Sequence, residues 1–177
     1  FAMPKMKTFL EENGPWSQLV NLENINIKAL KSDSTFSLNE RIKIKPFLVP
    51  HRDEFSETVG YEITINGKTL IFIPDIDKWE KWQTSILDLI KEVDYAFLDG
   101  TFYDSEEINH RDISEIPHPF IVESLELFKD LNISDKKKIY FIHLNHTNPA
   151  LDKSSIPFKN IISKGFNVAD LNMEFSL

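Results

Sequence analysis

Short apolar runs separated by polar breaks recur along the chain, and two of the clearest form a pair. Val59–Ile65 and Lys68–Ile73 predict a β-hairpin, because the intervening Asn66 and Gly67 are a strong two-residue turn signal. The second strand is almost continuously apolar, which is typical of a central strand buried on both faces. Upstream, Arg41–Val49 begins with strictly alternating charged and apolar residues, which predicts a strand with one solvated face.

The remaining segments complete the pattern. Apolar residues at helical spacing predict helices over Ala2–Asn13, with a short continuation at Trp16–Leu22, and over Trp79–Lys91 and Phe120–Leu131. β-Forming residues predict strands over Asn24–Leu30, Thr35–Leu38, Tyr95–Leu98 and Tyr140–His143. We expect a charged surface loop over Tyr103–Ile116. After Pro149 we expect a loop and a short hairpin that comprises Ile161–Ile162, Gly165–Phe166 and Asn167–Ala169, running towards Met173–Phe175. These elements predict a single domain over residues 1–177, of α/β class (α+β layered), with a mixed sheet and flanking helices.

The composition narrows the classes of function. The 177 residues suffice for one domain with a core, and 41% hydrophobic with 27% charged residues is ordinary for a globular protein. The net charge of −8 does not favour nucleic acid as a partner, although a metal could still bring phosphates to an acidic protein. Because there is no cysteine, any metal would bind to histidines and carboxylates. The sequence shows no apolar run of membrane-spanning length and no signal peptide, so we expect no membrane partner and a cytoplasmic location.

Residues that can bind metal or transfer protons stand where predicted strands end. His51, Asp75, Asp99 and His143 each follow or end one of these strands, and His118 precedes a helix. If the strands share one sheet, these side chains converge on one edge. Imidazole nitrogen and carboxylate oxygen are ligands for zinc, manganese or iron. A histidine beside an acid, held off the metal, suits general acid catalysis.

Each of these residues also has a plainer interpretation. A lone histidine after a strand, such as His51, is more often a capping or surface residue. Asp75 is placed to cap the next helix. Asp77 follows the same strand and is an alternative to Asp75 as a ligand. His143 and His146 are also compatible with a plain surface loop that carries two histidines.

Three strings resemble successive elements of the metallo-β-lactamase-fold hydrolases: VPHRDEFSETVGYEI, LIFIPDIDKW and IYFIHLNHTNP. The resemblance implies that His51, Asp75 and His143 are metal ligands, with Asp75 able to bridge two cations. AFLDGTF and IPHPF resemble the acid and histidine pair of the tRNase Z branch, with aspartate in place of glutamate. By that match, Asp99 and His118 would be a pair that either orients the metal ligands from outside or transfers protons. The implied fold is the second half of an αββα sandwich.

A more specific resemblance is to the pyrroloquinoline quinone biosynthesis protein B family, whose members carry strings similar to PDIDKW, DGTF, HPF and HLNHTNP. It implies a metal-dependent hydrolase-fold protein that acts on a small molecule, with His146 and Asn145 shaping the substrate pocket. One alternative within enzymes is a metal-dependent phosphodiesterase or a tRNase Z-like nuclease. Another alternative is a non-catalytic, metal-free binding or scaffold domain.

The sequence departs from the superfamily pattern at one motif. The HxHxDH string is absent from the 177 residues, and we expect it upstream of Phe1 in an intact protein. Three protein ligands remain for zinc or another divalent metal. We therefore expect this chain alone to bind metal weakly or not at all, and to be inactive. A half-fold with exposed sheet edges is also expected to self-associate, as a swapped homodimer.

Overall fold

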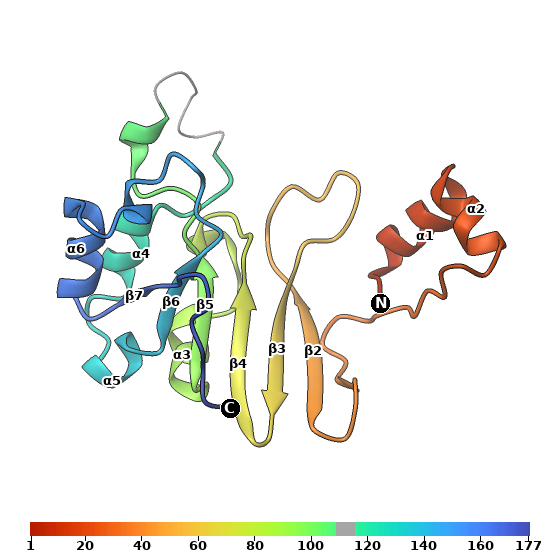
Figure 1. Ribbon diagram of the computed structural model, residues 1–177, viewed down its shortest axis with the longest axis horizontal. Helices are drawn as coiled ribbons and strands as arrows, with labels where there is room; N and C mark the ends of the chain where they lie inside the picture. Colours follow the sequence, from red (N-terminus) through yellow and green to blue (C-terminus); the bar gives the residue numbers. More distant parts are fainter. Residues whose placement is uncertain (109–115) are drawn as a thin grey trace.

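Seven strands form one mixed sheet within the residues that the computed structural model describes, 1–108 and 116–177 (Figure 1). They follow one another across the sheet in chain order: β1 (Phe36–Ser37), β2 (Ile42–Leu48), β3 (Val59–Ile65), β4 (Lys68–Ile73), β5 (Tyr95–Asp99), β6 (Ile139–Ile142) and β7 (Asn167–Val168). Neighbouring strands from β1 to β4 are antiparallel, and those from β4 to β7 are parallel. The predicted α/β class with a mixed sheet is confirmed.

The helices gather mainly beside the parallel half of the sheet. They are α1 (Pro4–Glu12), α2 (Trp16–Asn21), α3 (Ile86–Glu92), α4 (Ile121–Leu127), α5 (Ile133–Lys136) and α6 (Ile156–Ser163), with single 3-10 turns at Trp79–Lys81, Ser105–Glu107 and Pro149–Leu151. In Figure 1, α3, α4 and α6 lie beside β5 to β7, whereas α1 and α2 stand apart from the sheet beyond β2. Within the described ranges, none of these helices has the length and apolar character needed to cross a membrane.

The predicted hairpin is formed by β3 and β4, with Ile65 paired to Lys68. Asn66 and Gly67 both have positive φ angles, 51° and 86°. Positive φ at both central positions is the requirement of a type I′ turn, whose twist matches that of the flanking strands. The turn chemistry in the sequence thus fixes the register of the strand that leads to the candidate site.

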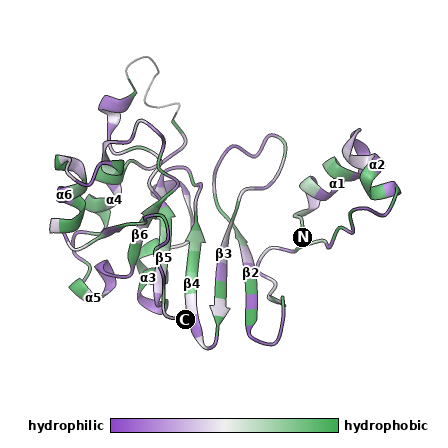
Figure 2. Ribbon diagram, in the orientation of Figure 1, coloured by the Kyte–Doolittle hydropathy of each residue, from purple (hydrophilic) through white to green (hydrophobic). Residues whose placement is uncertain are grey.

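One face of β4 is buried more completely than the other, which corrects the expectation that both faces are covered. Ile71 and Ile73 are fully buried, whereas Phe72 is 37% exposed. Phe72 lies in register with Phe97 on β5, which lies in register with Tyr140 on β6. This aromatic face is only partly covered, because the helices that pack against β4 to β6 cover the opposite face. Figure 2 shows hydrophobic residues on β4 and β5 and on helices α4 and α6.

The helix-covered face holds the core. Leu98 and Phe141, on neighbouring strands, pack with Ile121 and Phe128 of the α4 region, and all four are at most 1% exposed. Each such side chain contributes roughly 1.5–3 kcal/mol by leaving water. This packing holds the ends of β5 and β6 in place, and both strands lead directly into the candidate site.

Three sequence predictions of local structure are wrong. Asn24–Leu30 is not a strand, and it makes only a single bridge between Ala2 and Ala29. The helix predicted over Trp79–Lys91 is split into a 3-10 turn and α3. Ser85 is the N-cap of α3, because its side chain accepts a hydrogen bond from the backbone N–H of Asp88.

The third wrong prediction is the hairpin near the C-terminus. Ser155 caps α6 by accepting a hydrogen bond from the N–H of Phe158, and a proline lies in the first turn. These are helix-start signals. Asn167 and Val168 then form β7, parallel to β6. Of the loop predicted over Tyr103–Ile116, residues 109–115 lie outside the described residues.

Candidate metal centre

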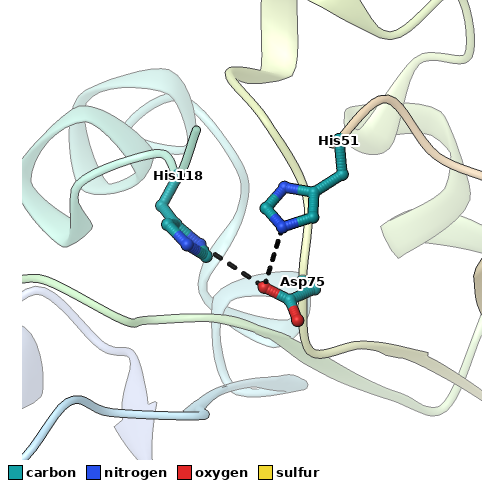
Figure 3. Close-up of side chains that lie close together, drawn as sticks. All are labelled: His51, Asp75 and His118. Carbon is teal, nitrogen blue, oxygen red and sulfur yellow. Dashed lines mark ion pairs between the residues drawn. The ribbon is translucent and has the colours of Figure 1, made fainter. Parts of the chain in front are cut away.

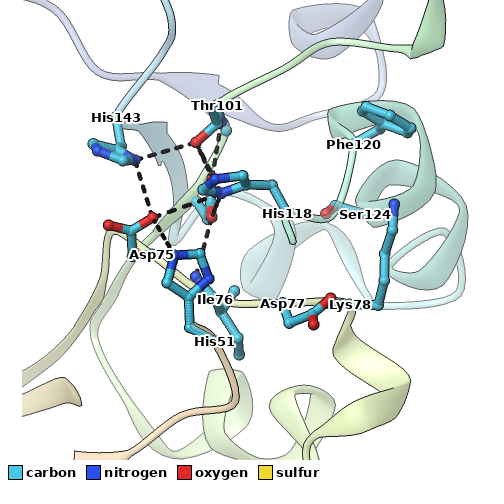
Figure 4. A network of polar contacts seen from close by, with 12 residues as sticks. His51, Asp75, Ile76, Asp77, Lys78, Thr101, His118, Phe120, Ser124 and His143 are labelled. Carbon is cyan, nitrogen blue, oxygen red and sulfur yellow. Dashed lines mark hydrogen bonds and ion pairs between the residues drawn. The ribbon is translucent and has the colours of Figure 1, made fainter. Parts of the chain in front are cut away.

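Side chains from separate strand ends meet at one edge of the sheet. His51 lies beyond β2, Asp75 beyond β4, Asp99 at the end of β5 and His143 beyond β6, while His118 precedes α4. Parallel β4, β5 and β6 place their carboxyl ends side by side. The antiparallel β2 brings in His51 because that strand is separated from β4 by the β3 hairpin strand and so runs in the same direction as β4. Figure 4 shows the resulting cluster.

The Asp75 carboxylate is the centre of the cluster. Its Oδ1 lies 3.5 Å from Nε2 of His51, 3.6 Å from Nδ1 of His118 and 3.8 Å from Nδ1 of His143. Figure 3 shows His51 and His118 pointing at this oxygen from two directions. The Asp75 side chain is 37% exposed, so the cluster is open to solvent on one side.

The distances from His51 and His143 fit a cation held at Asp75 better than direct hydrogen bonds, whereas Nδ1 of His118 is bonded to Asp99 at 2.8 Å. Separations of 3.5–3.8 Å are too long for hydrogen bonds between nitrogen and oxygen. Ligand atoms about 2.0–2.1 Å from a tetrahedral zinc ion lie roughly 3.3–3.4 Å from one another. Within the described residues, Nδ1 of His51 is buried without a hydrogen-bond partner, while Nε2 is the ring nitrogen nearest to Asp75. The ligand types and the distances from Asp75 therefore fit a divalent metal at Asp75, with His51 and His143 in two separate groups that both include Asp75.

His143 has a strained backbone. Its φ is 61°, in the left-handed region that residues other than glycine seldom adopt. Such conformations cost of order 1–3 kcal/mol and concentrate at functional sites. The turn directs the His143 ring back toward Asp75 while leaving 45% of the side chain exposed. The His143 imidazole is thus held near Asp75 by a backbone conformation that is itself unfavourable.

Asp99 has no exposed surface and accepts four hydrogen bonds. Its Oδ2 faces the backbone N–H of Ile76 at 3.2 Å and Nδ1 of His118 at 2.8 Å. Its Oδ1 accepts from the backbone N–H and the hydroxyl of Thr101, at 2.9 and 2.7 Å. By distance alone, Asp75, Asp99 and His143 could hold a metal, as could His51, Asp75 and His118. Since both Asp99 oxygens are already occupied, we assign Asp99 to orienting His118 rather than to metal binding.

Thr101 joins the cluster although sequence reasoning did not select it. Its hydroxyl lies 3.1 Å from Nδ1 of His143 and 3.3 Å from Nδ1 of His118. The available signal was its position two residues after Asp99 in the string DGTF, at a strand end. A hydroxyl there has no special meaning until the fold places it between two imidazoles.

Asp77, the alternative ligand, is committed elsewhere. Its Oδ1 accepts the backbone N–H of Lys78 at 2.7 Å and its Oδ2 the ammonium of Lys81 at 2.8 Å. Partial burial acts to raise the pKa of Asp77, but the bonds from Lys81 and Lys78 outweigh it and hold the pKa below its usual value. The geometry therefore favours Asp75 over Asp77.

Asn145 and His146 lie on the loop beyond β6. The N–H of Asn145 donates to the carbonyl of Thr101 at 2.9 Å, which ties this loop to the end of β5. The Asn145 side chain bonds Thr147 at 2.8 Å and faces Nδ1 of exposed His146 at 3.1 Å. Thr147 in turn donates to Glu107, where burial raises the pKa of the carboxyl despite opposing hydrogen bonds. This polar network flanks the Thr101 side of the cluster, and a role in substrate binding stays a prediction.

Buried Asn148 holds the two strand-end loops together. Its amide nitrogen donates to the carbonyls of Gly100 and Thr101, at 2.8 and 3.2 Å, and its oxygen accepts the N–H of Ala150. A Cβ at Gly100 would lie 2.9 Å from Cβ of Phe141, so only glycine lets β5 and β6 approach this closely. Both positions support the site without belonging to the cluster.

The sheet and its strand-end cluster of histidines and aspartates are those of a β-lactamase superfamily protein. The model of the beta-lactamase superfamily domain matches residues 1–144, and the chain belongs to that family. Within it, the chain is related to coenzyme PQQ synthesis protein B. It is 27% identical to that protein of Gluconobacter oxydans over 126 residues, which cover 68% of this chain and 40% of the relative. It is 26% identical to that of Methylococcus capsulatus over 156 residues, covering 81% and 48%.

The chain therefore spans less than half the length of these curated relatives. Among solved structures, Zn²⁺-bound PqqB from Methylobacterium extorquens matches with a TM-score of 0.76 at 21% identity, covering 99% of this chain and 64% of that one. A new diphosphatase from the PhnP family matches with a TM-score of 0.56 at 17% identity. At these identities the likeness shows the fold alone. The predicted resemblance to the PQQ biosynthesis protein B family is confirmed.

Proposed function

We propose that His51, Asp75 and His143 are ligands of a divalent metal centre, with zinc or alternatively manganese or iron, in a protein that acts on a small molecule. The observation that carries the proposal is the set of imidazole nitrogens 3.5–3.8 Å from Asp75 Oδ1. Within the described residues, no hydrogen bond to this carboxylate explains that convergence. The relation to PQQ synthesis protein B, one of whose solved structures is described as Zn²⁺-bound, supports the same ligand chemistry.

The residues around the metal ligands suit proton transfer. A bound divalent cation would act as a Lewis acid toward a substrate oxygen. Asp99 accepts the Nδ1–H of His118 at 2.8 Å, which orients the ring and leaves Nε2 to give or take a proton. His118 is only 14% exposed on its side chain, so its ring stays oriented by Asp99 rather than by water. Asn145 and His146 supply amide and imidazole groups beside the cluster for a polar substrate.

Calorimetric titration of the metal-free chain with zinc tests the proposal. We expect one ion per chain, with an affinity weaker than micromolar, because the HxHxDH ligands of the superfamily pattern are absent from the 177 residues. His51→Ala and His143→Ala should each abolish the measurable heat, whereas His146→Ala should bind as the parent chain does. Zinc binding that is retained in both His51→Ala and His143→Ala would contradict the proposal.

The alternative functions stay predictions with their own measurement. Hydrolysis of bis-p-nitrophenyl phosphate with added manganese or zinc is expected only if the protein is a phosphodiesterase or a nuclease. If the chain is a metal-free scaffold domain, neither zinc binding nor hydrolysis is expected. Self-association as a homodimer and a cytoplasmic location likewise stay predictions, and light scattering at high concentration tests the first of them.

A further inference from the structure

The segment after β7 folds back across the face of the sheet that the helices leave open. Figure 1 shows this segment passing in front of the sheet beside β5. Its Phe175 ring meets the rings of Tyr95, Phe97 and Tyr140 edge-on, with ring centroids 5.3, 4.9 and 4.9 Å away. Edge-to-face contact at these separations is a favoured geometry of aromatic pairs. One phenylalanine therefore covers the aromatic part of the open face over β5 and β6.

Little else attaches the segment Met173–Leu177 to the sheet. Within the described residues, no backbone hydrogen bond joins it to a strand, and its first residue donates only to the carbonyl of Asp170, at 3.3 Å. The Tyr95 hydroxyl faces the carbonyl of Ser176 at 3.4 Å, beyond the roughly 2.5–3.0 Å usual for such a bond. The side chains at the two ends of the segment are 43% and 37% exposed. Phe175 is therefore its main anchor.

The turn before the segment is held in place and defines a hinge. The Asp170 carboxylate bonds the ammonium of Lys153 and accepts the N–H of Leu171 at 2.8 Å. Asn172 has a φ of 63°, in the left-handed region that asparagine adopts more readily than most residues. Leu171 is 87% exposed and so makes little contact with the rest of the fold. Rotation at these two residues moves the segment off the sheet without disturbing β7.

The uncovered part of the same face suits a second copy of the chain. Phe72 is 37% exposed and lies in register with Phe97 on one side and with Tyr61 on the other. The rings in this row, from Tyr61 to Tyr140, are uncharged at neutral pH, so two such faces meet without bringing like charges together, although each chain carries a net charge of −8. Two-fold symmetry brings the same face of both copies together, and sheets pack about 10 Å apart. Met173–Leu177 occupies the space that such a partner needs.

We propose that Met173–Leu177 is a releasable cover, anchored by Phe175, that competes with a second copy of the chain for the aromatic face of the sheet. The face is then a self-association surface, and the position of this segment controls its use. The cover contacts none of the metal-centre residues through its anchor, so its role goes beyond the proposed function and does not depend on it.

Sedimentation velocity over a range of chain concentrations tests the proposal. Phe175→Ala, and a chain that stops at Asn172, should each dimerise at about tenfold lower concentration than the parent, because the aromatic contacts of the cover are lost. Phe72→Thr in the shortened chain should reverse this shift, since its ring lies in the exposed face. Leu127→Thr in the shortened chain is the matched control, because Leu127 is 39% exposed but lies on α4, and it should not reverse the shift.

A synthetic peptide of residues 170–177, added to the shortened chain, gives the second readout. It should lower the dimer fraction, whereas the same peptide with Phe175→Ala should not. Circular dichroism checks that each variant is folded. Self-association of folded Phe175→Ala at the same concentration as the parent overturns the proposal, whether or not the shortened chain folds. A dimer of the shortened chain that neither Phe72→Thr nor the peptide weakens also overturns it.

Discussion

Nδ1 of His118 lies 2.8 Å from Oδ2 of Asp99, a carboxylate with no exposed surface. The pair joins the segment before α4 to the end of β5, two regions whose pairing the sequence indicated only through the resemblance. The Asp99 carboxylate therefore has a structural role as well as its proposed orienting role. The first prediction tests how much the hydrogen bonds of Asp99 contribute to the stability of the fold.

Asp99→Asn should destabilise the protein by about 1–3 kcal/mol, because the new amide nitrogen must face groups that are themselves donors and leaves buried groups unpaired. Urea unfolding of the metal-free chain measures the loss. Asp130→Asn, at an exposed position, should stay within about 0.5 kcal/mol of the parent. Equal stabilities of the two variants would contradict the hydrogen-bond network described for Asp99.

Asp75→Asn should remove zinc binding, whereas Asp77→Asn should retain it. Asp75 faces the imidazoles, while Asp77 bonds Lys81 and the N–H of Lys78. The expected loss at Asp75 exceeds the roughly 10–100-fold that removal of a supporting hydrogen bond costs. Calorimetry on both variants checks the assignment. Loss of binding in Asp77→Asn alone would mean that the neighbouring carboxylate is the ligand.

Asp77 also predicts a pH dependence. Its pKa is held below the usual 3.8, although burial opposes this, by the bonds from Lys81 and Lys78. The folded state therefore favours the charged form, so the stabilisation is present above about pH 4 and is lost as the pH falls through the lowered pKa. We expect Asp77→Asn to be about 0.5–1 kcal/mol less stable at pH 7, since Lys81 is half exposed. The difference should shrink toward zero below pH 3.8, and a constant difference would contradict this account.

Asn148→Ala should weaken both the fold and the site. The substitution removes the buried donor of the Gly100 carbonyl and one of the two donors of the Thr101 carbonyl, at a cost of about 1–3 kcal/mol. Zinc affinity should fall as well, because the loops that carry Asp99 and His143 lose one of the bonds that link them. Thermal unfolding and zinc titration measure the two effects. Exposed Asn26→Ala is the control, and a zinc affinity as unaffected in Asn148→Ala as in this control would refute the link.

The sequence predicted the sheet best where turn chemistry and alternation agree. The β3–β4 hairpin follows from Asn66 and Gly67, and the polar residues after each strand predicted the edge where the cluster lies. The C-terminal region was mispredicted because Ile161 and Ile162 fit a strand by their apolar character, whereas the cap at Ser155 starts a helix. Local propensity is a weak guide where a capping signal competes with it.

The site was predicted as a set of residue types but not as a network. The positions of His51, Asp75 and His143 followed from strand ends and from the resemblance. The contacts of Thr101 and Asn148 did not, because these depend on the close approach of β5 and β6. Which of Asp75 and Asp77 faces the imidazoles also required the structure, since both follow the same strand and only Asp77 is engaged by Lys81.

The position of a bound metal tests the central claim most directly. Crystals of the chain soaked in zinc, measured on both sides of the zinc absorption edge, locate the ion by its anomalous scattering. The account predicts one peak, within bonding distance of His51, Asp75 and His143, and no such peak in Asp75→Asn. A peak that persists in Asp75→Asn, or that lies away from these three side chains, would contradict it.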